Sequence, residues 1–176
     1  MLRWRSGRPP KLKGDNVNKP TLAATTLAVA AAAGIGSIAS RPRSMSWYSR
    51  LKKPSYVPPN ELFPVAWTAL YADIATTSAV TIDRLRAAGR HDEARNYVVA
   101  LAVNLILNAG WSWVFFKYHK LGASTVGAAL LAASSADLSR RAAHADPRAG
   151  AALLPYPLWA AFATAMSGQI WVLNRS

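Results

Sequence analysis

Five stretches of the sequence are each about 20 residues long, mostly apolar and nearly free of charge, which is the length a helix needs to cross a lipid bilayer. They cover residues 21–39, 63–82, 97–116, 121–138 and 153–173. Only 16% of the residues are charged, well below the ~25% of soluble domains. The pattern predicts an all-α integral membrane protein, a bundle of five transmembrane helices. A soluble helical bundle is the alternative.

The segments outside these stretches have the composition of a tail and of connections. Residues 1–20 are basic and polar, which predicts a disordered N-terminal tail ahead of a helical domain at 21–176. Residues 40–62 carry four prolines and are predicted to form a loop. Residues 83–96 are charged and helix-prone, and residues 139–152 are polar, so we expect both to connect the membrane-spanning helices.

The charge of the chain is strongly basic, with 21 Lys and Arg against 8 Asp and Glu. The basic residues lie between the apolar stretches, which is typical of membrane-protein loops and argues against a nucleic-acid partner. Thirteen of them fall on the side of the N-terminus and eight on the other side. Because cytoplasmic loops are enriched in Lys and Arg, this predicts a cytoplasmic N-terminus.

Little in the sequence suggests a metal site or a catalytic set. There is no cysteine, and the three histidines are far apart without the spacing of metal ligands. No obligatory cofactor is expected. Asp73 is the one carboxylate near the middle of a predicted span, where an acid is costly and often functional. Its role is left open between a helix–helix hydrogen bond, a water-lined site and a ligand contact.

A polar and aromatic stripe runs along the third apolar stretch. Asn104 and Asn108 are four residues apart, and Trp111 and Phe115 continue the same helical face. Intramembrane asparagines often tie helices together, whereas aromatic walls with a few polar groups form ligand pockets. Both interpretations stay open. A ridge of small residues at every fourth position, Ser124 to Ala136, predicts close packing, either within the bundle or between two protomers.

Three segments carry the resemblance to a known family. "WYSRLKKPSYVPPN" followed by "VAWTALY", then "NLILNAGWSWVFF", then "LLPYPLWAAFATAMSGQIWVLN" are similar, in this order, to the signature segments of the tryptophan-rich sensory protein/translocator protein family, also called the peripheral-type benzodiazepine receptor family. The similar region spans residues 46–174. It implies a multi-pass protein of the lipid bilayer with five transmembrane helices, for which the cell membrane of a bacterium is the expected location.

The resemblance also implies a function and a partner. Family members are homodimers with a pocket for porphyrins and haem-type tetrapyrroles, and animal members bind cholesterol and benzodiazepine-site ligands. Porphyrin or haem is therefore expected as a ligand, for transport, sensing or scavenging. The expected ligand-binding residues are Trp67, Tyr71, Asn104, Asn108, Trp111, Phe115, Trp159 and Phe162. The loop 40–62 is expected to cover the pocket as a lid through Trp47, Lys52, Lys53, Pro54, Tyr56, Pro58 and Pro59.

Several positions depart from the family pattern. Tyr56 replaces a tryptophan of the loop, Trp113 a proline, and Ser167 an asparagine. Gly168 and Val172 replace the tyrosine and basic residue of the animal cholesterol motif, so sterol transport is the least supported function.

Two further classes of function remain as alternatives. One is an enzyme that degrades porphyrin in a light- or oxygen-dependent reaction, with Trp67 and Trp159 as redox-active rings. The other is a sterol- or lipid-binding membrane scaffold that acts through partner proteins.

Overall fold

The computed structural model describes residues 17–40 and 42–175, and these residues fold into helices joined by short connections. The predicted N-terminal tail lies outside the described residues, apart from residues 17–20. The elements, in chain order, are α1 (Lys19–Ala39), α2 (Pro42–Arg50), α3 (Leu62–Ala87), α4 (His91–Ser112), the π-helical segment η1 (Trp113–Lys117), α5 (Leu121–Ala145), α6 (Pro147–Ala152) and α7 (Pro155–Asn174).

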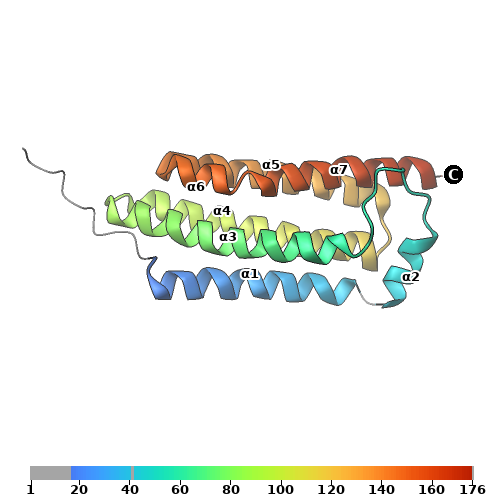
Figure 1. Cartoon of the computed structure of the whole chain (residues 1–176), viewed down its shortest axis with the longest axis horizontal. Coiled ribbons are helices and arrows are strands. Elements are labelled where there is room, and N and C mark those ends of the chain that lie inside the picture. Colours follow the sequence, from blue (N-terminus) through green and yellow to red (C-terminus); the bar gives the residue numbers. More distant parts are fainter. Residues whose placement is uncertain (1–16, 41, 176) are drawn as a thin grey trace, which may run out of the picture.

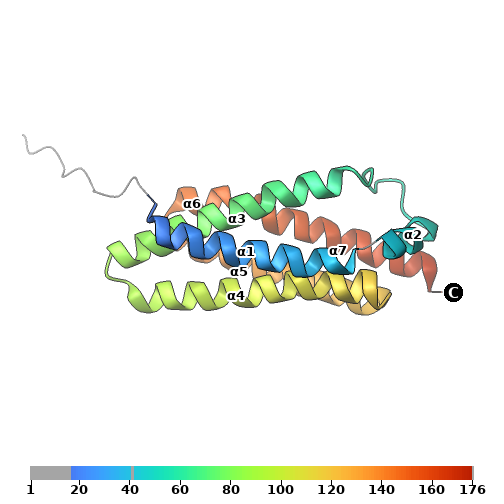
Figure 2. The same ribbon diagram turned by 90° about the horizontal axis from the view of Figure 1, so that it is seen from below.

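The long helices run side by side along the axis of the molecule (Figure 1). α5 packs most extensively on α7, and α4 contacts α1, α3 and α5. The beginning of α1, the α3–α4 turn and α6 lie at one end, whereas α2 and the C-terminus lie at the other (Figure 2). The start of α1 is tied to the end of α3, because the Thr21 hydroxyl donates to Asp83 Oδ1 over 2.7 Å.

Four helical segments within the described residues have the length and hydropathy to cross a membrane: α1, α4 with η1, α5, and α6 with α7. The all-α membrane prediction is confirmed for these four. The second predicted span, 63–82, lies in α3, which is long but is not among the four apolar segments of the described chain. Its polar and charged residues, including Asp73 and Asp83, lower its hydropathy. Large apolar side chains such as Leu27, Ile106 and Leu158 point away from the bundle, as lipid-facing residues do.

The predicted loop 40–62 contains a helix, so the expectation of a continuous loop is wrong. Residues 42–50 form α2, which begins at Pro42, and residues 51–61 after it are irregular. Proline at a helix start loses no hydrogen bond because its N–H would lack an intrahelical acceptor there. We keep the name lid for the whole segment 40–62.

The predicted connections 83–96 and 139–152 are also mostly helical. α3 continues to Ala87 and α4 begins at His91, so the turn is only residues 88–90. Ion pairs within the first turns of α4, such as Arg90–Glu93, support helix in this charged stretch. Gly89 adopts a φ of 71°, the left-handed conformation that ends helices. At the second connection, α5 extends to Ala145 and α6 follows directly.

Small residues allow close packing inside the bundle. Of the ridge on α5, Ser124 and Ala128 are buried within the protomer, whereas Ala136 is exposed. This favours packing within the bundle for the first half of the ridge. On α1, a methyl group added at Gly36 would lie 3.3 Å from Ser112 Oγ of α4. Gly36 therefore sets the close approach of α1 and α4.

Candidate functional site

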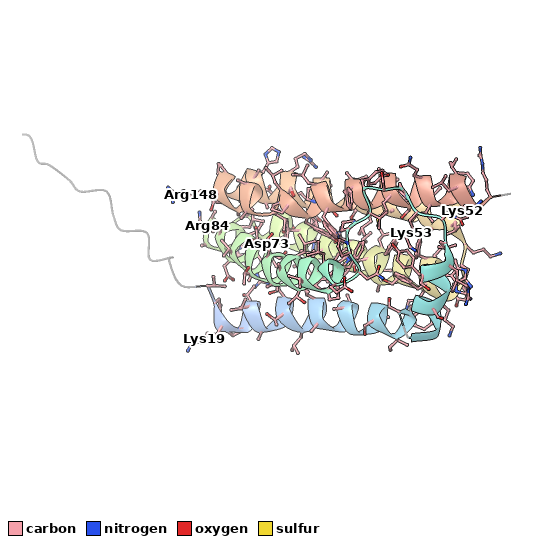
Figure 3. The ribbon with its side chains drawn as sticks, turned by 45° about the vertical axis from the view of Figure 1, so that its right-hand side comes forward. Lys19, Lys52, Lys53, Asp73, Arg84 and Arg148 are labelled. Atoms are coloured by element: carbon pink, nitrogen blue, oxygen red, sulfur yellow. The ribbon has the colours of Figure 1, made fainter. Side chains whose placement is uncertain are left out.

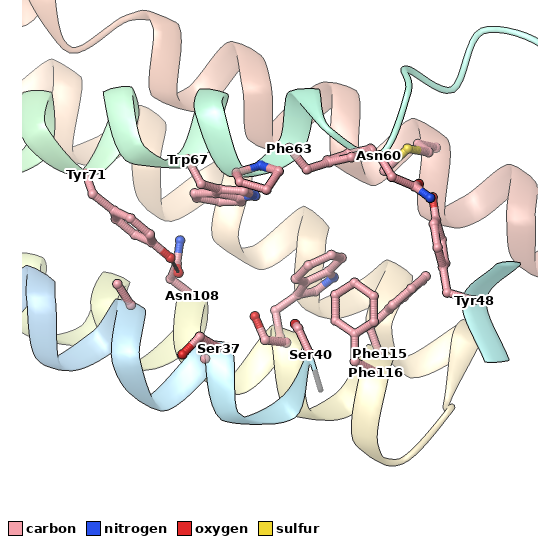
Figure 4. A pocket seen from close by; sticks show the side chains of 16 residues that line it. Ser37, Ser40, Tyr48, Asn60, Phe63, Trp67, Tyr71, Asn108, Phe115 and Phe116 are labelled. Carbon is pink, nitrogen blue, oxygen red and sulfur yellow. Dashed lines mark hydrogen bonds between the residues drawn. The ribbon is translucent and has the colours of Figure 1, made fainter. Parts of the chain in front are cut away.

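A cavity of about 440 Å³ lies between the helices at the lid end of the molecule. This volume falls within the ~300–1,000 Å³ of small-molecule sites. Its walls come from α1, α3, α4, η1 and α7, and the lid closes it at Tyr48 and Asn60 (Figure 4). The lining residues are Ala33, Gly36, Ser37, Ser40, Tyr48, Asn60, Phe63, Pro64, Trp67, Tyr71, Asn108, Trp111, Ser112, Phe115, Phe116 and Met166.

Two aromatic pairs form opposite walls of the cavity. Trp67 and Tyr71 are four residues apart on α3, and their ring centroids are 5.3 Å apart. Trp111 and Phe115 have the same spacing across α4 and η1, with stacked rings also 5.3 Å apart. Figure 4 shows Trp67 and Phe115 projecting from opposite sides. The cavity thus offers ring faces to a flat, apolar molecule.

The wall from η1 depends on a change of helix geometry. At this point the Tyr118 N–H donates to the Trp113 carbonyl oxygen five residues earlier, over 2.9 Å. Such π segments widen the turn and are frequent at functional sites. Phe115 and Phe116, neighbours in sequence, both line the cavity. Helical periodicity in the sequence contains no signal for this segment.

A chain of hydrogen bonds closes the inner end of the cavity. The Tyr71 hydroxyl donates to Asn108 Oδ1 over 2.8 Å, and Asn108 Nδ2 donates to the Tyr156 hydroxyl over 3.2 Å. The Tyr156 hydroxyl in turn donates to Asn104 Oδ1 over 2.7 Å. The chain links α3, α4 and α7, so it fixes the relative positions of the cavity walls.

Asn104 and Asn108 therefore have different surroundings. Asn108 lines the cavity, whereas Asn104 is fully buried and does not. Asn104 Nδ2 donates to the hydroxyls of Ser134 and Ser135 on α5, at 3.1 and 3.3 Å. The structure thus gives Asn104 the helix-tying role that the sequence left open.

Trp159 and Phe162, expected as ligand contacts, lie outside the cavity lining. Trp159 packs on Phe63, with ring centroids 6.0 Å apart, and Phe63 lines the cavity. Phe162 packs on Trp159 and on Tyr56 of the lid, at 5.7 and 6.1 Å. Trp159 and Phe162 therefore pack on residues of the cavity wall and of the lid without lining the cavity themselves.

The aromatic residues of the lid contact the cavity wall. The Trp47 ring stacks on His119, with centroids 3.9 Å apart, and meets Phe115 edge-on at 5.8 Å. Tyr48, its neighbour, is 4% exposed and lines the cavity. Burial raises the pKa of the Tyr48 hydroxyl above its ordinary value, so it stays neutral.

The irregular part of the lid is attached to the end of α7. The Lys52 N–H donates to Asn174 Oδ1 over 3.0 Å, and Asn174 Nδ2 donates to the Lys52 carbonyl oxygen over 2.9 Å. The Lys53 ammonium lies over the Tyr48 ring, 4.7 Å from its centroid. Pro54, Pro58 and Pro59 fall in the segment that follows, where fixed φ angles stiffen the chain.

Sequence reasoning missed much of the lining. It omitted Tyr48, Asn60, Phe63, Phe116 and Met166, and Ser112 of α4, whereas the small residues of α1 were expected as plausible walls and Ala33, Gly36 and Ser37 do line the cavity. The segments that carry the family resemblance contain Tyr48, Asn60, Phe116 and Met166, and Phe63 lies between two of them. Position in these segments was therefore an available signal, although nothing in it marked these residues as lining a cavity.

Two remaining features concern titratable groups. Asp73 does not line the cavity; its Oδ1 accepts from the Thr77 hydroxyl over 2.8 Å, and its Oδ2 is buried without a partner among the described residues. Within the described part of the chain, no cluster of three or more His, Asp or Glu residues could hold a metal ion.

Comparisons with known proteins agree with this architecture. The model of the TspO/MBR family matches residues 24–172. Protein CrtK of Rhodobacter capsulatus is 35% identical over 73% of this chain and 79% of its own length. Tryptophan-rich protein TspO of Chlorobaculum tepidum is 32% identical over 90% of this chain and 99% of its own length. Human translocator protein is 29% identical over 85% of this chain and 88% of its own length. The chain is thus a multi-pass integral membrane protein that belongs to the TspO/MBR family.

Proposed function

We propose that this protein binds porphyrins and haem-type tetrapyrroles in the cavity between Trp67 and Phe115, and that it serves their transport, sensing or scavenging. The carrying observation is the composition of the cavity: two aromatic pairs on opposite walls, and no charged residue among the described residues of the lining. A tetrapyrrole presents two flat apolar faces, which such rings contact by stacking.

The names of relatives support a ligand-handling role. Relatives are called tryptophan-rich sensory protein, from Cereibacter sphaeroides, and translocator protein, from human, cattle and pig. Sensing and translocation both require a site that binds the ligand reversibly.

We extend the proposal to the membrane arrangement. α3 has 26 residues and, at ~1.5 Å per residue, is about 39 Å long, more than the ~30 Å hydrocarbon thickness. It packs on both α1 and α4. It therefore crosses the bilayer with them, which brings the number of spans to five. We also propose that the protein forms homodimers and lies in a bacterial cell membrane.

A titration of the purified protein in lipid nanodiscs with protoporphyrin IX tests the proposal. Porphyrin absorbance and tryptophan fluorescence report binding. Trp67→Ala removes a wall ring whose aromatic contact is worth about 0.5–1.5 kcal/mol beyond its area. We therefore expect affinity to fall about tenfold or more, at ~1.4 kcal/mol per decade.

Trp171→Ala is the matched control, because Trp171 is 40% exposed and does not line the cavity. It should bind porphyrin like the parent. Equal affinity for the parent, Trp67→Ala and Trp171→Ala, with all three folded, refutes binding at this cavity. Absence of porphyrin binding to the parent refutes the function itself.

A further inference from the structure

The lid end of the molecule is basic. The lid segment 40–62 contains five Lys or Arg residues and one acidic residue, Glu61. Lys117, Lys120 and Arg175 belong to the same end, since the α4–α5 turn and the C-terminus lie beside α2 (Figure 2). The lid side of the cavity therefore faces a positive potential, which attracts anionic groups.

The Lys53 ammonium lies against a residue of the cavity wall. Its Nζ sits 4.7 Å from the ring centroid of Tyr48, which closes the cavity on the lid side. The same Nζ donates to the carbonyl oxygens of Ser49 and Leu51, at 3.2 and 3.3 Å. Figure 3 shows Lys52 and Lys53 at the end opposite Lys19, Arg84 and Arg148.

The Lys53 ammonium retains binding capacity. An ammonium has three N–H donors, and the two carbonyls occupy two of them. Among the described residues no carboxylate lies within ion-pair distance of Lys53, whereas Arg84, Arg90, Arg95, Arg140 and Arg141 each have one. One donor and the full charge of Lys53 are therefore available to a ligand.

The interior of the cavity offers no cation to a carboxylate. Among the described residues no Lys, Arg or His lines it, and the Asn108 amide already makes hydrogen bonds to two tyrosine hydroxyls. Burying an unpaired carboxylate there would be very costly. A ligand with an apolar ring and acidic substituents must therefore place its ring inside and its carboxylates at the lid.

We propose that Lys53 is a specificity-determining residue of the site, and that its ammonium pairs with a carboxylate of the ligand at the lid side of the cavity. The inference rests on the proposed tetrapyrrole binding and deepens it. It makes the preferred ligands ring molecules with carboxylates along one edge. A charge-assisted N–H···O bond would then fix the orientation of the ring between the aromatic walls.

Two ligands and three variants test this. Protoporphyrin IX carries two carboxylates, and its dimethyl ester has the same ring without the charge. Lys53→Gln removes the charge of Lys53, and Lys53→Arg retains it. Lys117→Gln is a matched control, because Lys117 Nζ also lies over an aromatic ring, that of Trp113 at 5.0 Å, but Trp113 does not line the cavity.

We expect the parent to bind the acid about tenfold more tightly than the ester, the usual scale of one charged hydrogen bond. Lys53→Gln should abolish this preference by weakening only the acid. Lys53→Arg and Lys117→Gln should keep it, and added salt should reduce it.

Two results would overturn the inference while leaving porphyrin binding intact. One is equal affinity of the parent for acid and ester. The other is a loss in Lys53→Gln that is the same for both ligands, which would assign Lys53 a role in lid folding alone. If the parent binds neither porphyrin, the proposed function fails, and the inference with it.

Discussion

Replacing Asn104 by leucine separates the helix-tying role of this residue from a ligand contact. The change removes three hydrogen bonds, one from the Tyr156 hydroxyl and two to serines of α5. Interhelical hydrogen bonds in membranes average about 0.6 kcal/mol each, so the loss should be about 2 kcal/mol. The Tyr156 hydroxyl still accepts from Asn108, and Ser135 still donates to Leu131, but the buried Tyr156 O–H loses its acceptor. The loss should therefore be at least this value.

The affinity for protoporphyrin should change less than twofold, because Asn104 does not line the cavity. Unfolding of the purified protein in mixed micelles gives the free-energy change, and a porphyrin titration of the folded fraction gives the affinity. Asn108→Leu is the comparison: Asn108 lines the cavity and bonds two tyrosines, so both quantities should fall. A tenfold loss of affinity in Asn104→Leu at unchanged stability would refute the reasoning.

Three more predictions concern the lid, the α5 ridge and the topology. Asn174→Ala removes both bonds to the Lys52 backbone, each worth about 0.5–1.5 kcal/mol. The lid amides should exchange hydrogen faster and porphyrin should dissociate faster; unchanged exchange contradicts the attachment. Ala128 is 2% exposed, so Ala128→Leu should cost about 1–3 kcal/mol by overpacking. A stable, folded monomer would instead place the ridge between protomers. Reporter fusions should place the N-terminus in the cytoplasm and the C-terminus outside; a C-terminal reporter active only in the cytoplasm contradicts this.

The long helices were predictable because the length of each apolar stretch can be counted in the sequence. The lid helix α2 was not, since its composition is polar and the four prolines of the segment 40–62 suggested a loop. The charged end of α3 and the charged beginning of α4 were also assigned to a connection. Hydropathy shows where a helix leaves the membrane, but the helix itself can continue beyond that point.

The candidate site was predictable to the extent that helical spacing places residues on one face. Trp67 with Tyr71, and Trp111 with Phe115, line the cavity at the expected four-residue spacing. The same spacing grouped Asn104 with Asn108, but the cavity ends between them. The lining by Phe116 and Tyr48 depends on the π segment and on lid packing, which are tertiary features that helical spacing does not predict.

The position of bound porphyrin tests the central claim most directly. A structure of the protein with protoporphyrin IX, determined in lipid nanodiscs, measures it. We predict ring density between Trp67 and Phe115, with the carboxylate edge toward Lys53. Porphyrin density on the lipid-facing surface, with the cavity empty, would contradict the account.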